Sequence, residues 1–108
     1  MPNYLKLVRD KIPQIIENSG LQFETRILSE EEYKTEVTKK LAEELQEFEK
    51  TENPKDAVEE LADILELIHA AAELNGSSFE EVEKVRVKKA EKRGGFKERI
   101  FLIEVEDE

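Results

Sequence analysis

Two pairs of acidic residues have a spacing that could build a metal site: Glu44 with Glu47, and Glu60 with Asp63. The members of each pair are three residues apart, a spacing that places both side chains on one side of a helix. Antiparallel packing of two such helices would bring the four carboxylates together. Clustered carboxylates cannot all stay ionised in an apolar setting without a cation. The chain has no cysteine, and hard oxygen ligands favour Mg²⁺, Mn²⁺ or Ca²⁺ over zinc.

The position of these acids on their helices favours a shared ligand. On a helical wheel of about 100° per residue, Glu44 falls near the centre of the apolar stripe of its helix. Glu60 and Asp63 lie on an apolar face of the next helix, away from its charged stripe. In a chain with 41% charged residues, one such glutamate would indicate only a solvated side chain. Two helices that break their patterning in the same way instead indicate a binding site, because a carboxylate that faces a core is costly without a partner.

The rest of the pattern predicts the elements that position these acids. Capping residues followed by periodic apolar positions predict four helices, and glycines or an Asn-Pro step end them. The predicted caps are Asp10, Ser29, Asn53 and Ser78, and the helices cover about 10–20, 29–50, 53–75 and 78–93. Apolar residues at even spacings or in a β-branched run predict two short strands that pair with each other, at 21–28 and 100–105. The expected fold class is mostly α: a helical bundle of about four helices with a small accessory pair of β-strands.

Composition narrows the class of protein. The net charge of −10 argues against general nucleic-acid binding, which needs a basic surface. No apolar run approaches the roughly 18 residues that span a bilayer, and the N-terminus has no apolar stretch typical of a secretory leader. We therefore expect a single domain over residues 1–108, cytoplasmic, with neither a nucleic acid nor a membrane as partner.

Basic side chains gather near the end of the chain. Residues 84–99 carry eight of the 17 lysines and arginines, against two acids. This asymmetry indicates an anion site, although a solvated helix face explains it about as often.

The acidic pairs belong to a longer pattern. The E-E-x-x-E … E-x-x-D signature of the MazG-like all-α nucleoside triphosphate pyrophosphatases is similar to residues 43–47, Glu-Glu-Leu-Gln-Glu, and 60–63, Glu-Leu-Ala-Asp. Residues 6–13, Lys-Leu-Val-Arg-Asp-Lys-Ile-Pro, and 93–96, Arg-Gly-Gly-Phe, resemble a compact house-cleaning branch of that superfamily. The branch is related to phosphoribosyl-ATP pyrophosphohydrolase, and the similarity covers nearly the whole chain.

The resemblance implies a helical bundle, usually oligomeric, with Mg²⁺ between the acidic helices and a bound triphosphate. The implied metal ligands are Glu44, Glu47, Glu60 and Asp63, with Mn²⁺ as an alternative ion. Glu43 would be a further ligand or a base, which makes Glu43 and Glu44 the implied catalytic residues. The implied reaction is hydrolysis of a noncanonical nucleoside triphosphate at the α-phosphorus, which gives a nucleoside monophosphate and pyrophosphate.

A leaving pyrophosphate needs cationic partners. The candidate substrate-binding residues are Arg9, Lys11, Lys89, Arg93 and Lys97. Each group also has a structural explanation: a capped helix start for the first two residues, and a basic helix end for the others. Phe96 is expected in the core rather than stacked on a base.

Three alternatives stay open at this point. The first alternative is the activity of a phosphoribosyl-ATP pyrophosphohydrolase. The second is a regulatory module that binds metal or nucleotide without hydrolysis. The third alternative is a di-iron bundle, since Glu66 and His69 form the E-x-x-H pair that such sites use, although the chain has one histidine. The broad apolar surface of residues 58–74 further predicts a homodimer or a higher homo-oligomer.

Overall fold

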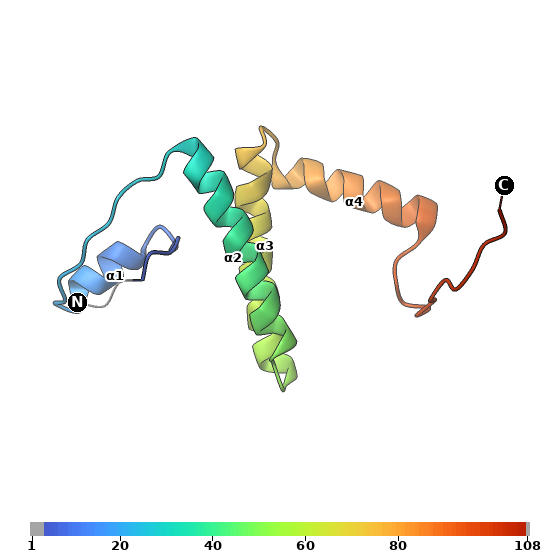
Figure 1. The fold of residues 1–108 in the computed structure, drawn as a ribbon, viewed down its shortest axis with the longest axis horizontal. Helices are drawn as coiled ribbons and strands as arrows, with labels where there is room; N and C mark the ends of the chain where they lie inside the picture. The colour runs from blue at the N-terminus through green and yellow to red at the C-terminus, as the bar shows by residue number, and fades with distance from the viewer. Residues whose placement is uncertain (1–3, 108) are drawn as a thin grey trace.

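The computed structural model describes residues 4–107 and contains four helices in this part of the chain (Figure 1). They are α1 (Ile12–Asn18), α2 (Glu30–Glu49), α3 (Pro54–Leu74) and α4 (Phe79–Arg93). Helices α2 and α3 form an antiparallel hairpin with a tight turn, and α4 leaves the other end of α3 as an arm (Figure 1). Helix α1 lies on the opposite side of the hairpin, at the end of a long linker. The predicted mostly α fold with four helices is confirmed.

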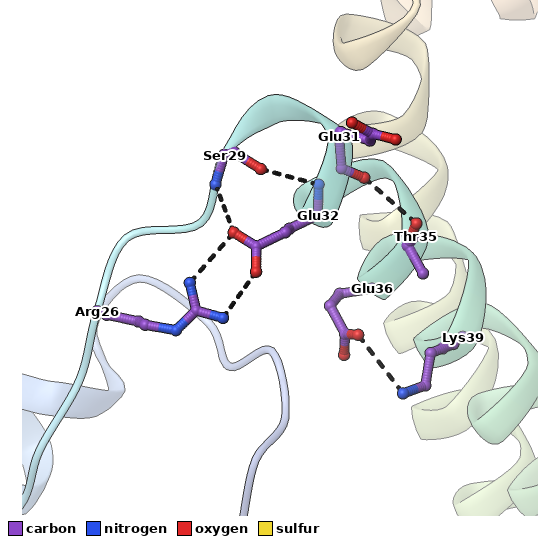
Figure 2. A network of polar contacts seen from close by, with 7 residues as sticks. All are labelled: Arg26, Ser29, Glu31, Glu32, Thr35, Glu36 and Lys39. Carbon is purple, nitrogen blue, oxygen red and sulfur yellow. Dashed lines mark hydrogen bonds and ion pairs between the residues drawn. The ribbon is translucent and has the colours of Figure 1, made fainter.

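The N-termini of α2, α3 and α4 are capped by the residues that the sequence predicts. The side chains of Ser29, Asn53 and Ser78 each accept a hydrogen bond from the backbone N–H three residues further on. Ser29 forms a full capping box, in which the Glu32 carboxylate accepts a 3.1 Å hydrogen bond from the Ser29 N–H (Figure 2). Arg26 donates two more hydrogen bonds to this carboxylate, at 3.1 and 2.8 Å. The bonds from Arg26 and then from Ser29 lower the pKa of Glu32 to about 2.

Removing the cap of α2 should destabilise the protein measurably. Ser29→Ala deletes the oxygen that accepts from the Glu32 N–H, and loss of such a cap costs about 1 kcal/mol. Urea unfolding followed by circular dichroism measures the change. Thr35→Ala is the matched control, because the Thr35 hydroxyl donates only to the Glu31 carbonyl within the same helix. The control should stay within about 0.5 kcal/mol of wild type, and equal losses in both variants would contradict the capping role.

The start of α1 differs from the prediction that Asp10 caps it. The residue at the cap position is Lys11, and its side chain makes no capping hydrogen bond. A capping side chain reaches the first amides of a helix from an extended backbone. Here the chain enters α1 through a turn, in which the Ile12 N–H donates to the Arg9 carbonyl at 3.1 Å. The other end is as expected, since Gly20 follows the helix with a φ of 79°.

The predicted pair of strands is wrong. Residues 21–28 and 100–105 both lie within the described part of the chain, and neither segment forms a strand there. The two segments lie on opposite sides of the α2–α3 hairpin (Figure 1), so they cannot pair with each other. Ile100 and Ile103 are each 85% exposed. A β-branched run favours a strand only where a partner strand is in reach, and these segments have none in the described chain.

Packing is concentrated on the hairpin. Val37 on α2 and Ala72 on α3 are the buried apolar residues of the described chain, at 2% and 7% exposure. Helix α3 also contacts α4, and among the described residues no other pair of helices is in contact. The radius of gyration is 18.5 Å, against about 13 Å for a compact domain of about 100 residues. Within residues 4–107, no helix is both long enough and apolar enough to cross a bilayer.

Candidate metal centre

The α2–α3 hairpin brings together acidic residues from its two helices. Glu44 belongs to α2, whereas Glu60 and Asp63 belong to α3, one turn apart. One carboxylate oxygen from each of the three lies within 4.8 Å of the other two. We call these three residues the acidic cluster. All three are half-buried, so the side chains stand at the edge of the helix contact rather than in open solvent.

Glu60 is the most constrained member of the acidic cluster. Its Oε2 atom is buried and has no hydrogen-bond partner. A buried polar atom without a partner is costly, so such an atom calls for a ligand or a proton. The Glu60 carboxylate and the two carboxylates that converge with it form an all-oxygen donor set, which fits a hard divalent cation such as Mg²⁺ or Mn²⁺.

The neighbours of Glu60 change its proton affinity. A hydrogen bond shared with Glu44 is the largest cause, followed by desolvation and by the charges of Glu44, Asp63 and Glu47. Together they raise the pKa of Glu60 to about 7. At neutral pH the Glu60 carboxyl group of the metal-free protein is therefore partly protonated.

This raised pKa predicts that the metal-free protein becomes more stable as the pH falls from about 7 to 4.5. The folded chain takes up the Glu60 proton near pH 7, whereas the unfolded chain does so near the ordinary glutamate value of 4.5. The stabilisation is therefore fully present below pH 4.5 and is lost as the pH rises through 7. Glu32 titrates below this window, because its pKa is about 2. Urea unfolding in EDTA at several pH values measures the slope.

Glu60→Gln is the control for the pH prediction. This variant has no titrating carboxyl at the position, so it should lose the part of the slope that lies between pH 4.5 and 7. Identical slopes in wild type and variant would mean that Glu60 does not hold the proton.

Two basic side chains offset part of the negative charge. The Lys40 ammonium lies 3.9 Å from Glu44 Oε1, one turn earlier on α2. The Arg9 guanidinium lies 2.6 Å from Asp63 Oδ1 and reaches it from the N-terminal segment. The Lys40 contact has a recognisable sequence signal, because its i, i+4 spacing is that of a helical ion pair. The Arg9 contact joins residues that are 54 positions apart, and no local pattern indicates it.

Two of the expected acidic residues lie outside the acidic cluster. Glu47 is exposed, and with Glu60 it lines an open depression of about 330 Å³ at the α2–α3 turn. Its charge still contributes to the raised pKa of Glu60, so it lies near enough to act on a ligand there. Glu43 is exposed and is not one of the converging residues.

The predicted substrate-binding residues are not gathered at the acidic cluster, with Arg9 as the exception. Lys89 and Arg93 lie on α4, which leaves α3 at the end away from the α2–α3 turn (Figure 1). Lys97 follows this arm, and Lys11 precedes α1. All four of these lysine and arginine side chains are exposed. Phe96 is 97% exposed, so the expectation that it belongs to the core is wrong.

His69 has a structural role at the joint between α3 and α4. Its ring stacks on that of Phe79, with centroids 4.0 Å apart and planes 6° apart. Among the described residues, the acidic cluster is the one group of three or more potential ligand residues that converges. Neither His69 nor Glu66 belongs to it, so the described structure gives the di-iron alternative no support.

Comparison with known proteins finds no match. No protein-family model matches the chain, and neither a curated protein nor a solved structure matches it. The chemical assignment of the acidic cluster therefore depends on its own geometry and on the residue pattern around it.

Proposed function

We propose that this protein is a Mg²⁺-dependent nucleoside triphosphate pyrophosphohydrolase of the MazG-like type, with a house-cleaning role on noncanonical nucleotides. One observation carries the proposal. Glu44, Glu60 and Asp63 converge from two helices, and a buried Glu60 oxygen has no partner within the protein. The resemblance of residues 43–47 and 60–63 to the signature of these enzymes supports the same assignment.

The acidic cluster would hold the metal, with Glu47 nearby in the lining of the depression at the α2–α3 turn. When bound, Mg²⁺ or Mn²⁺ would polarise the phosphoryl oxygens and lower the pKa of a bound water. Without such an ion, a triphosphate would be repelled by carboxylates on both sides of the hairpin turn. The bound cation would therefore let an anionic substrate approach the acidic site of a chain whose net charge is −10.

The chain's own residues would then position the substrate and move a proton. Water attacks the α-phosphorus, the bond from that phosphorus to the bridging oxygen breaks, and pyrophosphate leaves with the electron pair. Glu43 and Glu44 are the candidate groups to accept the proton of the attacking water. Arg9 is the cation nearest to the acidic cluster in the described chain, and its guanidinium could compensate the charge of the leaving pyrophosphate.

We include a homodimer or a higher homo-oligomer in this proposal. Apolar side chains of the hairpin remain open in the single chain, with Val58 63%, Leu45 54% and Leu61 49% exposed. Val58 and Leu61 are three positions apart on one face of α3, and an exposed apolar face of this kind marks an interaction site. A second copy of the chain would cover this face with the same apolar side chains. In addition, Lys89 and Arg93 belong to α4, which leaves α3 at the end away from the α2–α3 turn (Figure 1), so we assign them a role only at the site of another copy.

Light scattering at micromolar concentration should give the mass of two chains or more. Val58→Glu places a charge on the open apolar face and should shift the mass toward one chain, with the helices retained. Ile103→Glu is the control, since Ile103 is also exposed but lies outside the hairpin. A single-chain mass for the wild-type protein would contradict the proposed assembly.

The activity is tested by pyrophosphate release from a panel of standard and damaged nucleoside triphosphates, first with Mg²⁺ and then with EDTA. Phosphoribosyl-ATP belongs in the panel, because turnover of that compound alone would identify the alternative activity. We expect metal-dependent release with a nucleoside monophosphate as the second product. No release from any compound would leave a binding module built on the same acidic hairpin.

A further inference from the structure

The contact between Arg9 and Asp63 stands apart from the other polar contacts of the molecule. In the part of the chain that the structure describes, every other ion pair joins residues six or fewer positions apart. The Arg9 guanidinium instead crosses 54 positions to donate a 2.6 Å hydrogen bond to Asp63. It thereby ties the N-terminal segment to α3, at a member of the acidic cluster.

The Arg9 guanidinium and a divalent cation would compete for Asp63. Asp63 belongs to the three residues whose oxygens converge, and one of its two oxygens already accepts from Arg9. A guanidinium carries one positive charge and a divalent cation two, so their mutual repulsion at contact distance is strong. Occupation of the acidic cluster by the metal and retention of the Arg9–Asp63 pair therefore oppose each other.

The solvent exposure of the Arg9–Asp63 pair indicates which cation binds Asp63 more strongly. The side chains of Arg9 and Asp63 are 55% and 41% exposed, and ion pairs this open to solvent contribute little. A divalent cation would interact with all three carboxylates of the acidic cluster, because one oxygen of each lies within 4.8 Å of the others. The metal should therefore displace the guanidinium.

Little else holds the N-terminal segment in place. Helix α1 makes no contact with another helix of the described chain. Leu5 and Ile15 are 90% and 58% exposed, and no side chain of residues 4–20 is fully buried. Loss of the Arg9–Asp63 pair would consequently free the segment around α1.

We propose that Arg9 is an exchangeable internal counter-ion of the acidic cluster. It neutralises Asp63 in the metal-free protein, and metal loading releases both the N-terminal segment and a guanidinium that can bind the phosphates of a substrate. The proposal rests on the proposed function, because it requires the acidic cluster to bind a divalent cation. Arg9 thereby has a role before the substrate binds, because the metal controls when its guanidinium is free to bind phosphate.

The test is a Mn²⁺ titration followed by electron paramagnetic resonance, without nucleotide, on wild type, Arg9→Gln and Lys11→Gln. Arg9→Gln removes the competing cation and should bind Mn²⁺ roughly two- to fivefold more tightly than wild type. Lys11→Gln removes the same charge from the same segment, but Lys11 forms no ion pair in the described chain, so its affinity should stay at the wild-type value.

Hydrogen exchange provides a second readout that does not depend on affinity. In the wild-type protein, Mg²⁺ should speed the exchange of the α1 amides, because their tether to Asp63 is lost. In Arg9→Gln these amides should exchange fast with or without Mg²⁺.

The outcomes separate the counter-ion role from the proposed function. Mn²⁺ binding that is equally tight or weaker in Arg9→Gln would overturn the counter-ion role and leave the metal site intact. An equal gain in Lys11→Gln would also overturn it, because a general charge effect would then explain the result. If neither wild type nor Arg9→Gln binds Mn²⁺, the metal site itself is wrong, and the proposed function fails with it.

Discussion

Glu60→Gln is expected to lower pyrophosphate release on the order of a hundredfold or more, while the metal-free protein stays as stable as wild type or becomes more stable. A metal contributes several kcal/mol of transition-state stabilisation, and each 1.36 kcal/mol is a factor of about ten in rate. Glutamine keeps the shape of the side chain but removes the charge that a cation needs. It also removes the repulsion that Glu60 feels from Glu44, Asp63 and Glu47 in the metal-free protein.

Activity and metal-free stability must be measured on the same preparation of Glu60→Gln. Glu66→Gln is the matched control, because it makes the same substitution on the same helix, at an exposed residue outside the acidic cluster. It should retain wild-type activity. If Glu60→Gln is clearly less stable than wild type in EDTA, the Glu60 carboxylate is a structural partner and the metal-site assignment is wrong.

Addition of Mg²⁺ is expected to raise the melting temperature of the wild-type protein. A ligand that binds only the folded state at 100 times its dissociation constant stabilises it by about 2.7 kcal/mol. For a domain of this size, that free energy corresponds to a rise in Tm of about 10 °C or more. The physical source is the relief of clustered negative charge and of the unpartnered Glu60 oxygen.

Two controls distinguish a bound ion from general screening. Sodium chloride at the same ionic strength should give a much smaller rise in Tm, because monovalent salt screens exposed charges but does not bridge three carboxylates. The rise with Mg²⁺ should be lost in Glu60→Gln and kept in Glu66→Gln. A similar rise in both variants would place the stabilising ion elsewhere.

The helices and the centre of the candidate site were predictable because their signals are local. Ser29, Asn53 and Ser78 cap helices through contacts three residues away, and such contacts follow from the sequence alone. The spacing of Glu60 and Asp63, together with the position of Glu44 on its apolar stripe, was sufficient to predict that acids from two helices converge. An antiparallel hairpin with a short turn then leaves little freedom in register.

The parts that sequence reasoning missed depend on contacts between distant segments. A β-branched run such as 100–105 has the composition of a strand, but the fold decides whether a partner strand lies beside it. The exposure of Phe96 has the same origin, since Phe96 follows the far end of α4, and this arm runs away from the α2–α3 hairpin (Figure 1). The Arg9–Asp63 pair has no periodic spacing, and the turn before α1 that carries Arg9 was itself predicted differently.

The α2–α3 hairpin also sets an expectation for the kinetics of folding. Its two helices are adjacent in sequence and are joined by the short segment 50–53. Packing of α2 on α3 therefore requires the closure of only a short loop. Helical proteins with such local contacts fold within microseconds to milliseconds. Chain association, if it follows, depends on concentration and is the slower event. Refolding traces should therefore show a fast unimolecular phase for helix formation, followed by a phase whose rate rises with protein concentration.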